Sequence, residues 1–310
     1  MTAVNGDGVI ACVGEPLVCF ASTPRSSLVD SGCAEVSEGG AEFNVAVHLA
    51  RLGNAVRFVS AIGDDVLGRR IEARLHREGI DTTTLRRQPG ERTGAYVKDW
   101  TPSGRNVVYL RQGSAASRLA ELPAQALRDV THLHVSGITA SLSDACRGLV
   151  DRLLSGPRGY TVSFDVNYRE KLWPAAEAAP VLQRLASAAD LVLVGRDEAE
   201  QLWGTATADD VRRLLPRPAE LVVKDDDREA VAWSGTSRVA LAPTPVEVTE
   251  PIGAGDAFAA GYLHARLHGH APRPAIAVGH RMAQAALQAA DDLGAPVPVE
   301  ELDRLLKETG

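Results

Sequence analysis

Residues 253–261, Gly-Ala-Gly-Asp-Ala-Phe-Ala-Ala-Gly, open a predicted amphipathic helix directly after Val246–Thr249, which we expect to be a strand. Small residues at a helix start let backbone amides approach an anion closely, and the helix N-terminus adds partial positive charge there. A carboxylate at position 256 can accept a proton from a hydroxyl that attacks this anion. Alternatively, Asp256 only stabilises the helix N-terminus. The functional interpretation predicts a phosphate or oxyanion site formed by Gly253, Ala254, Gly255 and Asp256.

On both sides of this segment, short β-branched runs alternate with amphipathic helical stretches. Val45, Leu49 and Leu52, for example, recur with helical spacing and form one apolar stripe. This alternation predicts an α/β fold with crossover units on a mostly parallel sheet. The expected strands are Val9–Val13, Val56–Ala61, His132–Ser136, Thr161–Val166, Leu191–Val194 and Leu221–Lys224.

One region lacks the crossover helices. Gly94–Trp100 and Asn106–Arg111 are predicted strands separated by Thr-Pro-Ser-Gly, in which Pro and Gly favour a turn. Together with the polar segment Thr23–Gly39, this hairpin is expected to form a small β element beside the main sheet. We therefore predict a single domain over residues 1–310, with lid segments at approximately 15–38 and 92–114.

Composition excludes several classes of protein. Of 310 residues, 45 % are hydrophobic, and 33 Lys and Arg against 40 Asp and Glu give a net charge of -7. No chain-wide field would therefore recruit nucleic acid or an anionic membrane. The four cysteines form no C-x-x-C motif, and we find neither a secretory signal nor a membrane span. These features favour free thiols and a cytoplasmic location.

Two separated motifs carry a resemblance to a known family. Residues 253–261 resemble the C-terminal signature of the ribokinase-like (PfkB) carbohydrate kinases, and residues 39–46, Gly-Gly-Ala-Glu-Phe-Asn-Val-Ala, resemble the N-terminal one. The resemblance implies a ribokinase-like fold with a small β-sheet lid, ATP and Mg²⁺ as cofactors, and Asp256 as the general base. It also implies that Gly40 and Asn44 contact sugar hydroxyls, whereas the residues alone suggest only a helix entry and a capping residue.

Within this family, residues 93–96, 109–117 and 165–169, together with the loop at 291–294, resemble the 2-keto-3-deoxygluconate kinases. Tyr109 and Arg111 are two residues apart on a predicted strand and so share a face, and Arg suits a planar carboxylate. The resemblance implies a sugar-acid substrate, phosphorylated on its terminal hydroxyl, and a homodimer formed through the lids. Without the resemblance, the residues alone suggest that Arg111 is a solvated charge on the lid and that Arg169 forms a surface ion pair. The implied substrate-binding residues are Tyr96, Tyr109, Arg111, Asn167, Arg169 and Asp292.

The chain also departs from the family pattern near the expected nucleotide site. Asp226 and Glu229 stand where two glycines usually follow the strand, and these acids should weaken binding of a polyphosphate. Lys224 offsets part of this repulsion and is the expected nucleotide contact. Of the family's N-x-x-E element, which organises hydrated magnesium, only Glu198 is present.

These departures keep two alternatives open. One is a kinase for a neutral sugar of the fructose or ribose type, or for a nucleoside, in which case the arginines lack an anionic partner. The other is a non-catalytic sugar-acid sensor with a degraded nucleotide site.

Overall fold

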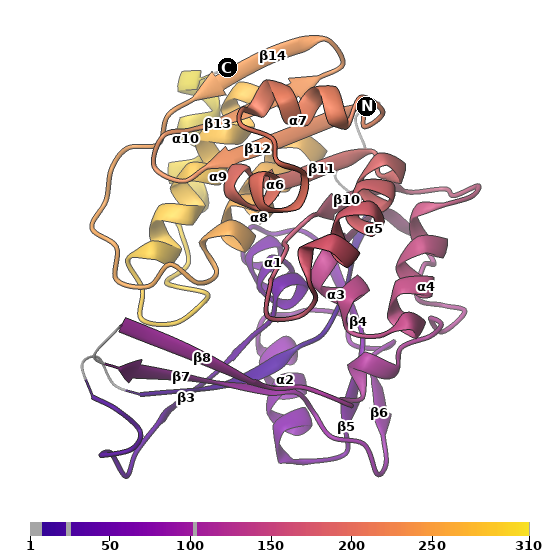
Figure 1. Cartoon of the computed structure of the whole chain (residues 1–310), viewed down its shortest axis with the longest axis vertical. Helices are drawn as coiled ribbons and strands as arrows, with labels where there is room; N and C mark the ends of the chain where they lie inside the picture. Colours follow the sequence, from indigo (N-terminus) through magenta and orange to yellow (C-terminus); the bar gives the residue numbers. More distant parts are fainter. Residues whose placement is uncertain (1–7, 23–25, 102–103, 310) are drawn as a thin grey trace.

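The computed structural model describes residues 8–22, 26–101 and 104–309. In this part of the chain, an eight-stranded sheet forms the centre of the molecule (Figure 1). Its six consecutive strands from β12 to β4 are parallel, and β13 and β14 extend one edge in antiparallel pairing. The order is β14 (Ser237–Leu241), β13 (Glu229–Ser234), β12 (Glu220–Asp225), β11 (Leu191–Gly195), β10 (Thr161–Asp165), β9 (Val130–Ser136), β1 (Val9–Val13) and β4 (Val56–Val59).

Helices cover both faces of this sheet because its parallel strands carry apolar side chains on both sides. On β11, Leu191 and Leu193 pack with α1, α8, α9 and α10, whereas Val192 and Val194 pack with α4, α5, α6 and α7. The helices are α1 (Ala41–Arg51), α2 (Val66–Arg77), α3 (Gly137–Ser141), α4 (Asp144–Leu154), α5 (Ala175–Ala188), α6 (Arg196–Trp203), α7 (Ala208–Leu214), α8 (Ala254–Leu267), α9 (Pro272–Leu287) and α10 (Val299–Thr309), with a 3₁₀ turn at Ala116–Arg118.

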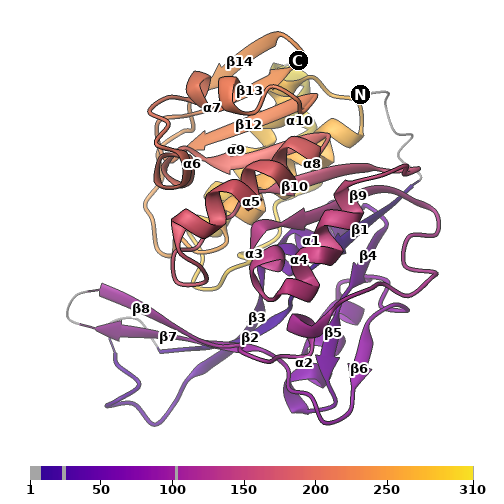
Figure 2. The same ribbon diagram turned by 45° about the vertical axis from the view of Figure 1, so that its right-hand side comes forward.

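A separate four-stranded sheet, which we call the lid, projects from this body (Figure 2). Its order is β3 (Glu35–Gly39), β2 (Leu17–Ala21), β7 (Ala95–Thr101) and β8 (Gly104–Leu110). Only the central pair, β2 and β7, is parallel. A third, two-stranded sheet joins β5 (Ala61–Gly63) and β6 (Arg86–Gln88). The predicted architecture, a mostly parallel sheet with helices and a small β-sheet lid, is confirmed.

Several predicted boundaries need correction. Val246–Thr249 is not a strand: Val248 is 54 % exposed, and two prolines just upstream of it, at 243 and 245, cannot donate to a ladder. The run Val56–Ala61 divides at Ser60 because β5 leaves the main sheet to pair with β6. The hairpin strands begin and end within two residues of the prediction, and Arg111 lies just past β8. Residues 23–25 and 102–103, in the predicted turn-rich segments, lie outside the described part of the chain.

Candidate active site

A cavity of about 470 Å³ lies between the lid and the carboxyl ends of the parallel strands, where open α/β sheets bind their ligands. It brings together residues from both signatures, the lid and the C-terminal loop. Of the predicted site residues, those that line it are Gly40, Asn44, Tyr96, Tyr109, Arg111, Asn167, Arg169, Glu198, Lys224, Gly253, Gly255, Asp256 and Asp292. Ala254 begins α8 between two of them.

The N-terminus of α8 faces this cavity through Gly253, which takes a left-handed backbone with φ of 90°. The position requires glycine, because a Cβ there would lie 2.1 Å from the carbonyl oxygen of Asp292. The amide of Ala257 is already bonded to the Gly253 carbonyl. The first backbone amides of α8 and the positive end of its dipole therefore face the cavity, where they can bind an anionic group.

Asp256 lies in the first turn of α8 and is held by two amide side chains. Its Oδ2 accepts a hydrogen bond from Asn44 Nδ2 at 2.8 Å, and its Oδ1 accepts one from Asn167 Nδ2 at 3.3 Å. Asn44 is therefore not a helix cap; α1 is capped by Gly40. Burial raises the pKa of Asp256 to about 7, and the nearby Asp165 carboxylate adds to the shift. A carboxyl group with this pKa can gain and lose a proton near neutral pH.

Two ion pairs lie in the wall of the cavity near Asp256. Lys224 Nζ lies 3.0 Å from Asp165 Oδ2, and Arg169 Nη1 lies 3.0 Å from Glu198 Oε1. Burial alone would lower the pKa of Lys224, but the carboxylates of Asp165 and Glu198 outweigh it and raise that pKa. Lys224 therefore stays charged beside Asp256. The other oxygen of Asp165 is buried and has no hydrogen-bond partner among the described residues.

The lid contributes an aromatic and cationic wall. Tyr96 and Tyr109 are directly opposite each other on β7 and β8, with ring centroids 6.0 Å apart. Arg111 lies over the Tyr109 ring, 5.5 Å from its centroid. Its Nε donates to Glu15 Oε2 at 2.6 Å, so its charge is already balanced inside the protein. Glu15 was not singled out from the sequence, because it is 96 residues from Arg111.

Asp292 is buried at the base of this wall. Its Oδ2 accepts a hydrogen bond from Tyr96 Oη at 2.5 Å, and its Oδ1 binds Lys98 Nζ. Lys98 also contacts Glu250 Oε2 at 3.1 Å. Sequence reasoning missed Lys98, although a strand period of two already placed it on the same face as Tyr96.

Asp226 and Glu229 lie at the tight turn between β12 and β13. Asp226 is exposed and takes a left-handed backbone with φ of 44°, a conformation that glycine adopts at lower cost. Glu229, by contrast, is the first residue of β13, so only Asp226 occupies a position whose backbone favours glycine.

Comparison with known proteins identifies the family. Residues 9–297 match the family described as "pfkB family carbohydrate kinase". The 2-dehydro-3-deoxygluconokinase of Bacillus subtilis is 33 % identical over 290 residues, 90 % of each chain, and the 2-dehydro-3-deoxygalactonokinase of Haloferax volcanii is 29 % identical over 95 % of each. Fructokinase from Xylella fastidiosa, solved with bound ATP, is 25 % identical with a TM-score of 0.85, covering 97 % of this chain and 99 % of its own.

The chain therefore belongs to the pfkB family of carbohydrate kinases, and the ribokinase-like fold is confirmed. It is an enzyme that transfers a phosphoryl group to a sugar. Among the described residues, no helix is both long and apolar enough to cross a membrane.

Proposed function

We propose that the enzyme uses ATP to phosphorylate the terminal hydroxyl of 2-keto-3-deoxygluconate or a closely related keto sugar acid. The observation that carries this proposal is the arrangement of Asp256, whose carboxylate is held between Asn44 and Asn167 in a cavity that also contains Arg169. The two relatives named above as keto-deoxy sugar kinases support the choice of substrate class.

Asp256 acts as the general base in this proposal. Its Asn44 and Asn167 partners fix the carboxylate beside the start of α8, so a sugar hydroxyl bound there can pass its proton to Asp256 as it attacks the phosphorus atom. Backbone amides at 253–256 stabilise the charge on the transferred phosphoryl group. Gly40 and Asn44, at the start of α1, contact the sugar hydroxyls on the other side.

Recognition of the sugar carboxylate rests on Tyr109, Arg111 and Arg169. Because Arg111 is buried against Glu15, the side chain of Arg169, 47 % exposed, is the more accessible guanidinium. Glu198 holds Arg169 at the cavity edge, and a carboxylate ligand can bind the remaining N–H groups of the same guanidinium. Asp292 and Tyr96 complete the wall around the sugar.

The residues around Lys224 fit a nucleotide with magnesium. Lys224 supplies positive charge to the phosphates beside Gly253 and Gly255, and a Cβ on Gly255 would lie 3.6 Å from its Nζ. No group of three or more acidic, His or Cys side chains among the described residues could hold a metal directly. Mg²⁺ usually keeps several waters and binds through one or two carboxylates plus substrate phosphates. Glu198 and the unpartnered oxygen of Asp165 fit that mode, and the ion would neutralise phosphate charge.

An ADP-release assay across a sugar panel tests this proposal. We expect 2-keto-3-deoxygluconate to be used with a kcat/KM about ten- to a hundredfold above fructose and ribose, which corresponds to a charge-assisted pair of about 1.5–3 kcal/mol. A neutral sugar is the second candidate, because both arginines already have glutamate partners. Equal or better use of fructose would favour it, whereas sugar binding without ADP release would favour a sensor.

We also propose a homodimer formed through the lid. Val36 on β3 and Val108 and Leu110 on β8 are exposed by 38 %, 47 % and 55 %, which leaves apolar side chains on the lid surface. A second copy would cover them. Light scattering should give twice the mass of one chain, and V108D/L110D should reduce it to one; a wild-type monomer would contradict the proposal.

A further inference from the structure

A lysine of the lid lies buried between two carboxylates of the body. Lys98, on β7, has a side chain only 1 % exposed. Its Nζ is 3.1 Å from Glu250 Oε2 and also binds Asp292 Oδ1, and these partners lie 152 and 194 residues away in the sequence. One ammonium therefore bridges the lid and two separate loops.

Both loops shape the backbone at the start of α8. Glu250 Oε1 accepts a hydrogen bond from the amide of Ile252 at 3.2 Å, directly before Gly253. On the other side, Gly253 packs against the Asp292 backbone, where even one methyl group would not fit. The positions of Glu250 and Asp292 therefore determine where the first amides of α8 point.

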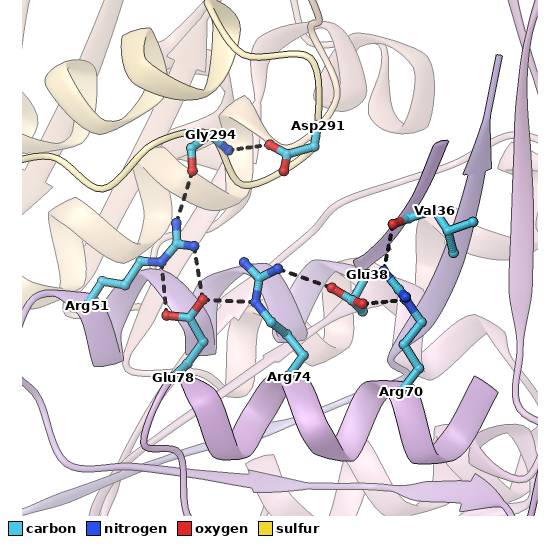
Figure 3. Close-up of polar contacts among 8 residues, drawn as sticks. All are labelled: Val36, Glu38, Arg51, Arg70, Arg74, Glu78, Asp291 and Gly294. Atoms are coloured by element: carbon cyan, nitrogen blue, oxygen red, sulfur yellow. Dashed lines mark hydrogen bonds and ion pairs between the residues drawn. The ribbon is translucent and has the colours of Figure 1, made fainter. Parts of the chain in front are cut away.

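The loop that carries Asp292 has a second connection to the lid, which Figure 3 shows. Arg51 Nη1 donates to the carbonyl oxygen of Gly294 at 3.0 Å and pairs with Glu78. Arg74 pairs with the same Glu78 and, at 3.1 Å, with Glu38 on lid strand β3. The loop is thus held from two lid strands, by Lys98 directly and by this chain of ion pairs on its other side.

We propose that Lys98 is a positioning residue that couples the lid to the anion-binding loop at Gly253. When the lid strand β7 is seated, its ammonium holds Glu250 and Asp292 together and so fixes the amides that stabilise the transferred phosphoryl group. The inference rests on the proposed function for the site of transfer, but it does not depend on which sugar is used.

The charge of the Lys98 ammonium explains why the position of the Gly253 loop depends on this residue. Buried carboxylates repel each other strongly when no countercharge lies between them. Without the ammonium, the Glu250 and Asp292 side chains would move apart, and this movement would displace the loop at Gly253. A displacement of about 1 Å can reduce turnover about 10²-fold.

The decisive variant is K98M/E250Q, which removes one positive and one negative charge and leaves the net charge of the cluster unchanged. The E250Q side chain keeps an Oε1 for the Ile252 amide, so we expect the variant to fold. In this variant the two carboxylates no longer repel each other, so the expected fall in kcat of at least tenfold would come from loss of the ammonium bridge between the lid and the two loops. K98R, which keeps the charge, should retain more activity than K98M. The control is K307M, because Lys307 is an exposed lysine on α10.

Hydrogen exchange provides a readout that needs no substrate. In K98M/E250Q, the amides of residues 250, 252–255 and 291–294 should exchange at least tenfold faster than in wild type, with no change in the main sheet. If a folded K98M/E250Q keeps wild-type kcat and wild-type exchange in these loops, Lys98 does not position them. If the wild-type chain phosphorylates no sugar, the proposed function fails, but the exchange experiment still decides the role of Lys98.

Discussion

Gly253 and Asp292 are packed so closely that a Cβ on Gly253 would lie 2.1 Å from the Asp292 carbonyl oxygen. We expect Gly253→Ala to lower both the unfolding temperature and kcat, because the left-handed backbone alone costs a non-glycine residue about 1–3 kcal/mol and the clash is with backbone. Thermal unfolding and ADP release measure both effects. The matched control is Gly255→Ala, whose Cβ would have ordinary contact with Lys224. Equal behaviour of the two variants would contradict the packing argument.

The pKa of Asp256 predicts the pH dependence of activity. Burial raises it to about 7, and only the deprotonated carboxylate can accept a proton, so kcat/KM should fall with one-proton slope below about pH 7. The hydrogen bond from Asn44 lowers this pKa, so Asn44→Ala should move the acid limb to higher pH. Measurements of kcat/KM between about pH 5 and 9 test both statements. An acid limb near the ordinary value of about 4 in the wild type would contradict them.

The raised pKa of Asp256 should also make stability depend on pH, with stability falling where activity rises. Because the pKa of Asp256 is raised from its ordinary 3.8, the folded state binds this proton more tightly than the unfolded state. The resulting stabilisation is fully present below about pH 4 and is lost as pH rises through about 7. Relative to Asp256→Asn, the wild type should therefore lose unfolding free energy as the pH rises across this window. Denaturant unfolding at about pH 5 and about pH 8 measures it.

Asp226 and Glu229 should weaken nucleotide binding. Changing both to glycine removes two carboxylates and relieves the left-handed backbone at Asp226, so the KM for ATP should fall while the KM for sugar stays nearly constant. Because Asp226 is exposed, screening limits the charge effect. Steady-state kinetics with each substrate varied tests this. An unchanged or higher KM for ATP would show that this turn does not limit binding, and activity found only in the double variant would favour a sensor.

Local sequence could predict the parallel sheet and the start of α8, because both depend on short-range patterns. The apolar runs at Ile10–Val13 and Leu191–Val194 are buried on both faces, and this pattern is visible without knowledge of the partners. The strand predicted at Val246–Thr249 failed because β-propensity depends on context: Val248 is exposed, and two prolines precede the segment.

The ion pairs across the site could not be predicted from the sequence, because they join residues that only the folded structure brings together. The sequence indicated Arg111 as a cation for the substrate, but nothing local reveals that Glu15 neutralises it. Strand spacing placed Lys98 on the same face as Tyr96, but nothing local reveals its two partners, which are 152 and 194 residues away. Resemblance to a family indicated candidate site residues from local motifs, whereas these ion pairs join residues that only the fold brings together.

The central claim is that Asp256 is the base for transfer to a sugar acid, and Asp256→Asn tests it most directly. Asparagine keeps the size of the side chain and one of its two acceptor oxygens but cannot accept the hydroxyl proton. We predict a kcat for 2-keto-3-deoxygluconate about 10²–10⁴-fold below wild type, with the dissociation constant for the sugar largely unchanged by calorimetry. A variant that binds the sugar and retains more than about a tenth of wild-type kcat would contradict the account.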